Sequence, residues 1–182
     1  MPERATSDEF LMQAAGRGDL GAFEEIVRRH QAWAWRVAYR FLGHEEDAAD
    51  AVQDAFLRLL DAGSRYRPAA SFRTYLYQVV SRVCLDRAKK KRPLYVKEVP
   101  EIPDPCPDAD ETMVRDETAA AVRVALDALP PRQRMAVVLK YYEGLSYTDI
   151  ADAMGITVKA AERLLANARK SLQSSLARLK GD

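Results

Sequence analysis

Residues 146–157 have the sequence Ser146-Tyr-Thr-Asp-Ile-Ala-Asp-Ala-Met-Gly-Ile-Thr157, which predicts two helices joined by a tight turn. Ser146 and Asp149 have the spacing of a capping box, so a helix is expected to begin there. Gly155 supplies the left-handed residue of the turn, and Thr157 can cap the helix that follows. The stretch therefore indicates a helix-turn-helix, whose second helix typically enters the major groove of DNA.

The expected second helix, from 157 to about 179, has one apolar and one polar face. The residues expected to face the core are Ala161, Leu164, Leu165, Ala168, Leu172 and Leu176. The outer face suits base recognition, because Arg prefers guanine, Asn prefers adenine and Glu accepts from the cytosine amino group. The base-contacting candidates are Lys159, Glu162, Arg163, Ala166 and Asn167, while Arg169 and Lys170 lie further along and suit phosphates. The alternative is an ordinary amphipathic surface helix.

The N-terminal half predicts four further helices, because apolar residues recur there at helical spacing. They are expected to cover about 7–16, 19–43, 45–61 and 70–92. Polar caps and terminal glycines set the first boundaries, namely Ser7 and Gly16 for the first helix and Asp19 and Gly43 for the second. Four helices of this kind can close around one core.

Residues 93–117 break the helical pattern. Acidic residues fill the gaps between five prolines, which are Pro93, Pro100, Pro103, Pro105 and Pro107. Such a composition predicts a flexible linker. Helical spacing then resumes, with segments expected at 131–143, 146–154 and 157–179. The predicted fold is therefore all-α, with an N-terminal helical domain (1–92), an acidic, Pro-rich linker (93–117) and a C-terminal helix-turn-helix domain (118–182).

Composition argues against several classes of protein. Of the 182 residues 48% are hydrophobic, which is enough to fill a core, and the two cysteines, Cys84 and Cys106, form no CxxC pair. Neither a disulfide framework nor a zinc site is expected. The N-terminus lacks a signal peptide and no apolar run approaches the roughly 20 residues of a membrane span, so a cytoplasmic protein without membrane insertion is expected. Without a phosphate-binding glycine loop or a catalytic triad, the sequence predicts neither an enzyme nor a cofactor.

The net charge of +1 conceals blocks of opposite sign. Basic residues gather at 82–92 and again at 159–180, and acidic residues gather between them at 101–117. Such blocks indicate more than one partner surface, including one for a polyanion. The alternative is that they are solvated helix faces.

Three stretches resemble bacterial sigma factors of the extracytoplasmic-function group. Residues 129–157 are similar to the promoter-binding C-terminal domain of that family. Asp47-Ala-Ala-Asp-Ala-Val-Gln-Asp-Ala-Phe-Leu-Arg58 resembles its polymerase-docking helix, and residues 72–87 resemble its helix for the minus-ten promoter element. The resemblance covers both expected domains in the right order. It implies a dissociable, non-catalytic subunit that binds core RNA polymerase and directs it to promoter DNA.

The resemblance also implies roles for individual residues. Asp50, Gln53 and Asp54 would face a coiled coil in the largest polymerase subunit. The melted minus-ten strand would be surrounded by aromatic rings that stack on bases and by polar groups that hold the backbone, namely Tyr66, Arg67, Tyr75, Tyr77, Gln78 and Arg82. Lys90, within the basic run 89–92, would add a phosphate contact. The outer face of the 157–179 helix would contact the minus-thirty-five duplex, and the linker would pass through the polymerase channel.

Two departures from the family pattern concern promoter choice. Arg82 stands where many members have Asn, and residues 161–164 differ from the common Val-Lys-Ser-Arg, so the target sequence is not carried over. Members of this group are commonly held inactive by an anti-sigma factor, which implies such a partner here. The competing hypothesis is a stand-alone helix-turn-helix regulator that binds as a dimer. The polymerase-docking resemblance argues against it.

Overall fold

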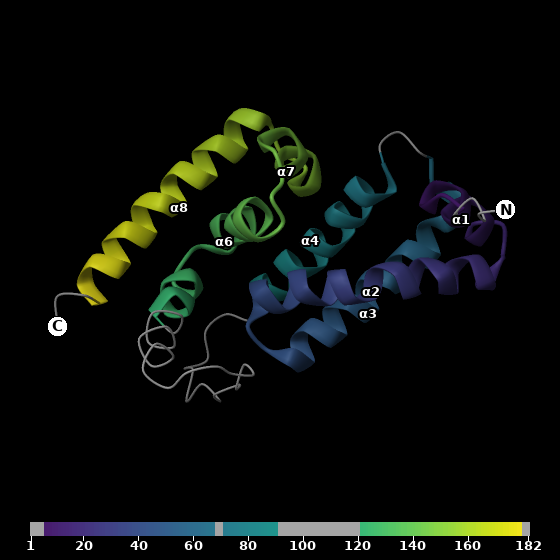
Figure 1. Cartoon of the computed structure of the whole chain (residues 1–182), viewed down its shortest axis with the longest axis horizontal. Coiled ribbons are helices and arrows are strands. Elements are labelled where there is room, and N and C mark those ends of the chain that lie inside the picture. The colour runs from purple at the N-terminus through teal and green to yellow at the C-terminus, as the bar shows by residue number, and fades with distance from the viewer. Residues whose placement is uncertain (1–5, 68–70, 91–120, 180–182) are drawn as a thin grey trace, which may run out of the picture.

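The computed structural model describes residues 6–67, 71–90 and 121–179, and within these ranges all regular structure is helical (Figure 1). The N-terminal unit consists of α1 (Asp8–Ala15), α2 (Leu20–Leu42), α3 (Glu45–Ala62), a 3₁₀ turn (Gly63–Arg65) and α4 (Phe72–Lys90). The C-terminal unit consists of helical residues 121–127, α6 (Pro131–Val137), a π-helical turn (Val138–Tyr142), α7 (Tyr147–Met154) and α8 (Val158–Leu179). The all-α prediction is confirmed, whereas the predicted linker at 93–117 lies outside the described residues.

Local capping sets the helix boundaries as predicted. Asp19 accepts a hydrogen bond from the backbone N–H of Ala22 at 3.0 Å, and Gly43 ends α2 in the left-handed region at φ 77°. The Ser146–Asp149 capping box is present in both directions. Gly155 has φ 61°, a conformation that disfavours residues with a Cβ, so the chain turns sharply between α7 and α8.

The N-terminal core lies between α2, α3 and α4, which pack against one another, with α1 against α2. Its largest fully buried side chains include Ile26, Phe41, Leu59 and Phe72. Burying a side chain of this size contributes about 1.5–3 kcal/mol. None of the described helices is both long and apolar enough to cross a membrane.

The two units lie against each other, which the sequence did not predict. α4 packs against α7 and α6, and α2 contacts the π-helical turn (Figure 1). The buried apolar side chains of both units form one continuous cluster. This contact decides which of the candidate residues face solvent.

The N-terminus of α4 is held by a carboxylate from α1. The backbone N–H of Phe72 donates to Glu9 Oε1 at 2.9 Å, and this bond is the main cause that lowers the pKa of Glu9 from 4.5. A lowered folded-state pKa contributes stability above pH 4.5 that is lost as the pH falls further. We therefore expect the melting temperature of Glu9→Gln to fall less steeply than that of wild type as the pH is lowered from 5 to 3. Glu24→Gln, at an exposed position of α2, is the control and is expected to follow wild type; an identical profile for Glu9→Gln contradicts the role of this cap.

Candidate nucleic-acid and partner interfaces

The outer face of α8 presents its polar residues to solvent. All of the candidates for DNA contact on this helix are exposed, namely Lys159, Glu162, Arg163, Ala166, Asn167, Arg169 and Lys170. Ala161, Leu165 and Ala168 are buried on the opposite face. The predicted division of faces is confirmed, and the turn at Gly155 leaves the exposed face free to lie against another molecule. Contact with bases stays a prediction.

Arg169 is held in place by two phenols. Its Nε donates to the hydroxyl of Tyr141 at 2.9 Å, and an Nη donates to the hydroxyl of Tyr147 at 3.4 Å. The hydrogen bond to Tyr141 is the main cause that raises the pKa of Arg169, so the guanidinium stays charged. A fixed cation at this place suits a phosphate. The sequence does not predict either tyrosine contact, and the π-helical turn that places Tyr141 beside α8 has no local sequence signal.

The candidates on and before α4 separate into two groups. Gln78, Arg82, Arg67 and Lys90 are exposed, and Tyr75 is half-buried. Tyr75, Gln78 and Arg82 are three and four residues apart and so share one face of α4. Tyr66 is buried with its ring 5.3 Å from that of Tyr75, and burial raises the pKa of both phenols.

Tyr77 is buried and does not lie on the face of α4 that carries Tyr75, Gln78 and Arg82. Its side chain is 2% exposed, and its ring meets Trp33 edge-on with centroids 4.4 Å apart. Its hydroxyl donates to Glu143 at 3.3 Å and accepts from Arg73 at 3.4 Å. Burial raises the pKa of the phenol. In this arrangement the ring is not accessible to a base, so a role for Tyr77 at the minus-ten strand requires the C-terminal unit to move.

The expected polymerase-docking residues lie on α3, where two of the three are paired within the chain. Asp54 accepts two hydrogen bonds from Arg58 at 3.2 Å, and Asp50 lies 3.6 Å from the guanidinium of Arg87. Gln53 is exposed. The acidic character expected of this face is therefore partly neutralised by neighbouring arginines.

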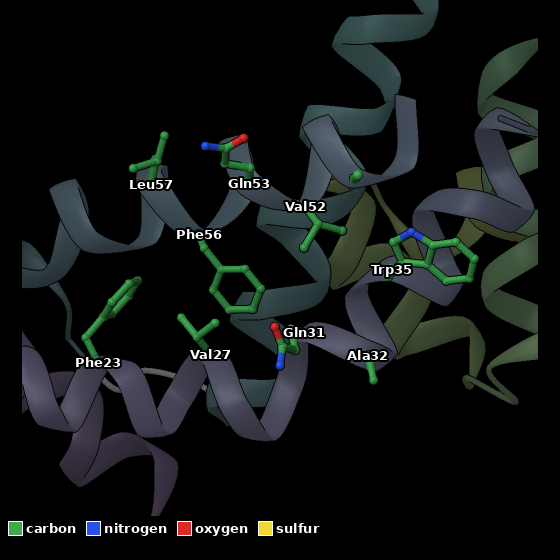
Figure 2. Close-up of a pocket in the computed structure, with 10 residues that line it drawn as sticks. Phe23, Val27, Gln31, Ala32, Trp35, Val52, Gln53, Phe56 and Leu57 are labelled. Carbon is green, nitrogen blue, oxygen red and sulfur yellow. The ribbon is translucent and has the colours of Figure 1, made fainter. Parts of the chain in front are cut away.

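A groove that the sequence does not predict lies between α2 and α3 (Figure 2). It has a volume of about 560 Å³ and a mainly apolar lining, which includes Phe23, Val27, Trp35, Val52 and Phe56. Gln53 and Leu57 border it from α3, and Leu57 is 54% exposed. The apolar residues of the lining recur at helical spacing on both helices. Such spacing predicts that a side chain is buried, but it does not show whether another part of the chain packs over it. The docking face thus combines an apolar groove with polar residues.

No group of three or more His, Cys, Asp or Glu side chains in residues 6–67, 71–90 and 121–179 is arranged to hold a metal ion. Cys84 is buried, and burial raises the pKa of its thiol to about 12, so it is not a reactive group.

Two family models match the chain. Residues 26–93 match sigma-70 region 2, and residues 119–172 match sigma-70 region 4. The chain is 37% identical over 177 residues to the ECF RNA polymerase sigma factor SigM of Mycobacterium tuberculosis, covering 96% of this chain and 85% of that protein. It is 30% identical over 163 residues to SigE of Mycolicibacterium smegmatis, covering 87% of this chain and 63% of that longer protein.

Solved structures share the fold. CnrH, in complex with the cytosolic domain of CnrY, has a TM-score of 0.69 at 26% identity, covering 95% of this chain and 99% of that chain. The sigma factor RpoE of Bartonella quintana, in complex with the anti-sigma factor NepR, has a TM-score of 0.66 at 18% identity, covering 85% of this chain and 96% of that chain.

Proposed function

The chain belongs to the sigma-70 family, in its extracytoplasmic-function group, and from this membership we propose that it binds core polymerase through the α2–α3 face and promoter DNA through α4 and α8. It is a sigma factor that directs RNA polymerase to promoters, and proteins of this family are in general not enzymes. One observation supports this assignment of surfaces: the two matched regions contain them. The region 2 match runs from within α2 through α4, and the region 4 match includes the helix-turn-helix.

The division of labour follows from the chemistry of each surface. α8 offers exposed Arg, Glu and Asn side chains, which suit the base edges of a closed duplex. α4 offers Tyr75, Gln78 and Arg82 on one face, which suits an unpaired strand because a ring can stack on a base while a guanidinium holds the backbone. We therefore assign the minus-thirty-five duplex to α8 and the minus-ten strand to α4. The domain boundaries 1–92, 93–117 and 118–182 are part of this proposal.

The polymerase-facing surface is best explained by a helical partner. The open groove has a mainly apolar lining that includes Gln53, and the same helix, α3, carries the arginine-paired carboxylates Asp50 and Asp54. Such a face accepts apolar side chains in the groove and basic or polar ones beside it. A coiled-coil segment offers both along one helix. We place this interaction in the cytoplasm, where polymerase and promoter are found. We also propose an anti-sigma factor as regulator, since the sigma factor RpoE of Bartonella quintana, which shares this fold, was solved in complex with the anti-sigma factor NepR.

The purified chain tests the function directly. Mixed with core RNA polymerase, it is expected to co-elute on size exclusion and to give run-off transcripts from a subset of a promoter library. A stand-alone regulator instead elutes apart from polymerase and binds duplex DNA as a dimer. The same experiment therefore separates the two hypotheses.

The docking face gives a quantitative prediction. Replacing Gln53 and Asp54 by alanine is expected to weaken core polymerase binding by about 1–2 kcal/mol, or roughly 5- to 30-fold, because Gln53 lines the groove and Asp54 is the next residue of α3, paired with Arg58. The Arg58–Asp54 pair is exposed, so its loss costs little stability. Affinity is measured by competition for core, with far-UV circular dichroism as the folding check. Asp61→Ala, exposed at the end of α3, is the matched control, and equal affinity of the double variant and wild type contradicts the assignment.

A further inference from the structure

Arg169 is an exposed cation of α8 whose contacts leave most of its donors free. Its Nε donates to the hydroxyl of Tyr141 at 2.9 Å, and an Nη donates to the hydroxyl of Tyr147 at 3.4 Å. A guanidinium carries five N–H donors, so these two hydrogen bonds leave three for a ligand. Because the two phenols already hold the group, less conformational freedom is lost when a ligand binds it.

A second cation contacts the ring of Tyr147. Lys140 of the π-helical turn has its ammonium 4.8 Å from the ring centre and donates to a backbone carbonyl oxygen at 3.0 Å. In the part of the chain that the structure describes, neither Lys140 nor Arg169 forms an ion pair with a carboxylate. By contrast, the exposed Arg28 and Arg58 pair with carboxylates of their own helices. The positive charge around Tyr147 is therefore not neutralised by those residues and can attract an external anion.

The place of Arg169 along α8 indicates which anion it meets. Glu162, Ala166 and Arg169 are separated by four and then three residues, so they form one stripe at the edge of the base-facing side. Arg169 lies about 10 Å beyond Glu162 along the helix, at a rise of roughly 1.5 Å per residue. The major groove is about 12 Å wide, so a side chain this far from a base contact reaches the phosphates that border the groove.

The neighbouring elements place the two tyrosines at the same border. α8 packs against α6 and α7 (Figure 1), and Tyr147 is the first residue of α7. In a helix-turn-helix the first helix crosses the DNA backbone while the second lies in the groove. Arg169 is therefore hydrogen-bonded to the helix that crosses the backbone, and both helices can contact one strand at this point.

We propose that Arg169 and Tyr147 bind one backbone phosphate of the minus-thirty-five duplex, that Lys140 adds positive charge to this site, and that Tyr141 is a positioning residue for Arg169. The proposal rests on the proposed function, because it takes α8 as the surface for this duplex. The guanidinium and the Tyr147 hydroxyl donate to the phosphate, and the Tyr141 hydroxyl fixes the Nε side of the guanidinium. A phosphate contact has no base preference of its own, so the site sets the orientation of α8 in the groove and not the promoter sequence.

The site is tested with holoenzyme reconstituted from core polymerase and the full chain. The probe is the promoter duplex that the wild-type holoenzyme selects from a randomised library. Arg169→Gln is expected to weaken binding about tenfold, as the loss of a charged hydrogen bond does. The slope of log affinity against log salt is expected to fall by about 0.9, the value for one phosphate. Selection with Arg169→Gln is expected to return the wild-type sequence, and a changed base preference overturns the phosphate assignment.

Tyr141→Phe separates positioning from charge, because it removes only a hydroxyl. It is expected to weaken binding about threefold. In an Arg169→Gln background the same change is expected to have no further effect, since the group that it positions is gone. Losses that add in the double variant overturn the positioning role. Tyr142→Phe is the matched control and is expected to equal wild type, because this exposed tyrosine of the same turn lies against Arg40 and not against α8.

A neutral methylphosphonate at single backbone positions of the upstream element locates the phosphate. One position is expected at which the substitution weakens wild type but not Arg169→Gln, and the absence of any such position overturns the site. If Arg169→Gln lowers affinity for core polymerase and not for the duplex, the ligand is an acidic protein segment and the phosphate site is wrong. A wild-type holoenzyme that selects no promoter counts instead against the proposed function.

Discussion

Phe72→Ala is expected to lower the free energy of unfolding by about 3–5 kcal/mol, the cost of removing a large ring from a packed core. Phe72 is 0% exposed and begins α4. Its ring lies 5.4 Å from His30 of α2 and 6.3 Å from Tyr66, between centroids. The cavity therefore opens where α4 meets α2 and beneath the proposed minus-ten surface. Equilibrium denaturation in urea measures the change.

Phe10→Ala is the matched control, because Phe10 of α1 is 56% exposed and loses little buried area when truncated. Its expected cost is below about 0.5 kcal/mol. Equal losses for the two variants contradict the packing described for the N-terminal core. Because α4 carries Tyr75, Gln78 and Arg82, Phe72→Ala is also expected to reduce open-complex formation at temperatures well below those that affect wild type.

Arg163→Ala is expected to weaken promoter binding by about 1–3 kcal/mol, or roughly 5- to 150-fold, and to relax base preference at one or two positions of the minus-thirty-five element. Arg163 is exposed on the outer face of α8, one residue from Glu162, and a guanidinium that binds guanine with two hydrogen bonds discriminates strongly against other bases. Selection from a randomised upstream element, with the holoenzyme of each variant, measures both effects.

Lys170→Ala provides the comparison, since Lys170 is exposed on the same helix about two turns further on, where a helix leaving the groove meets the phosphate backbone. It is expected to weaken all promoters alike and to reduce the salt dependence of binding by about one phosphate contact. If Arg163→Ala selects the same sequence as wild type, the register of α8 on the DNA is wrong, and Lys159 and Ala166 become the residues to test.

The sequence by itself determined the helices and the division of their faces. Ser146 with Asp149, Asp19 with Ala22, and Gly155 are local signals, because a cap or a left-handed turn involves residues only a few positions apart. Helical spacing likewise sorted α8 correctly into buried Leu165 and exposed Arg163, since a period of 3.6 residues fixes which side chains share a face. The family resemblance, carried by motifs in both halves, was confirmed by the region 2 and region 4 matches.

The tertiary structure alone decided what covers each face. Periodicity shows that a side chain is apolar and on a stripe, but not whether another helix lies over it, so the groove lined by Phe23 and Phe56 was not foreseen. Glu143 meets Trp33 across 110 positions of sequence, and a π-helical turn shifts it out of the register that a regular helix predicts. Tyr77, which the sequence places with the DNA-contacting residues, is buried because the packing of two units sets its surroundings, and no local pattern encodes that packing.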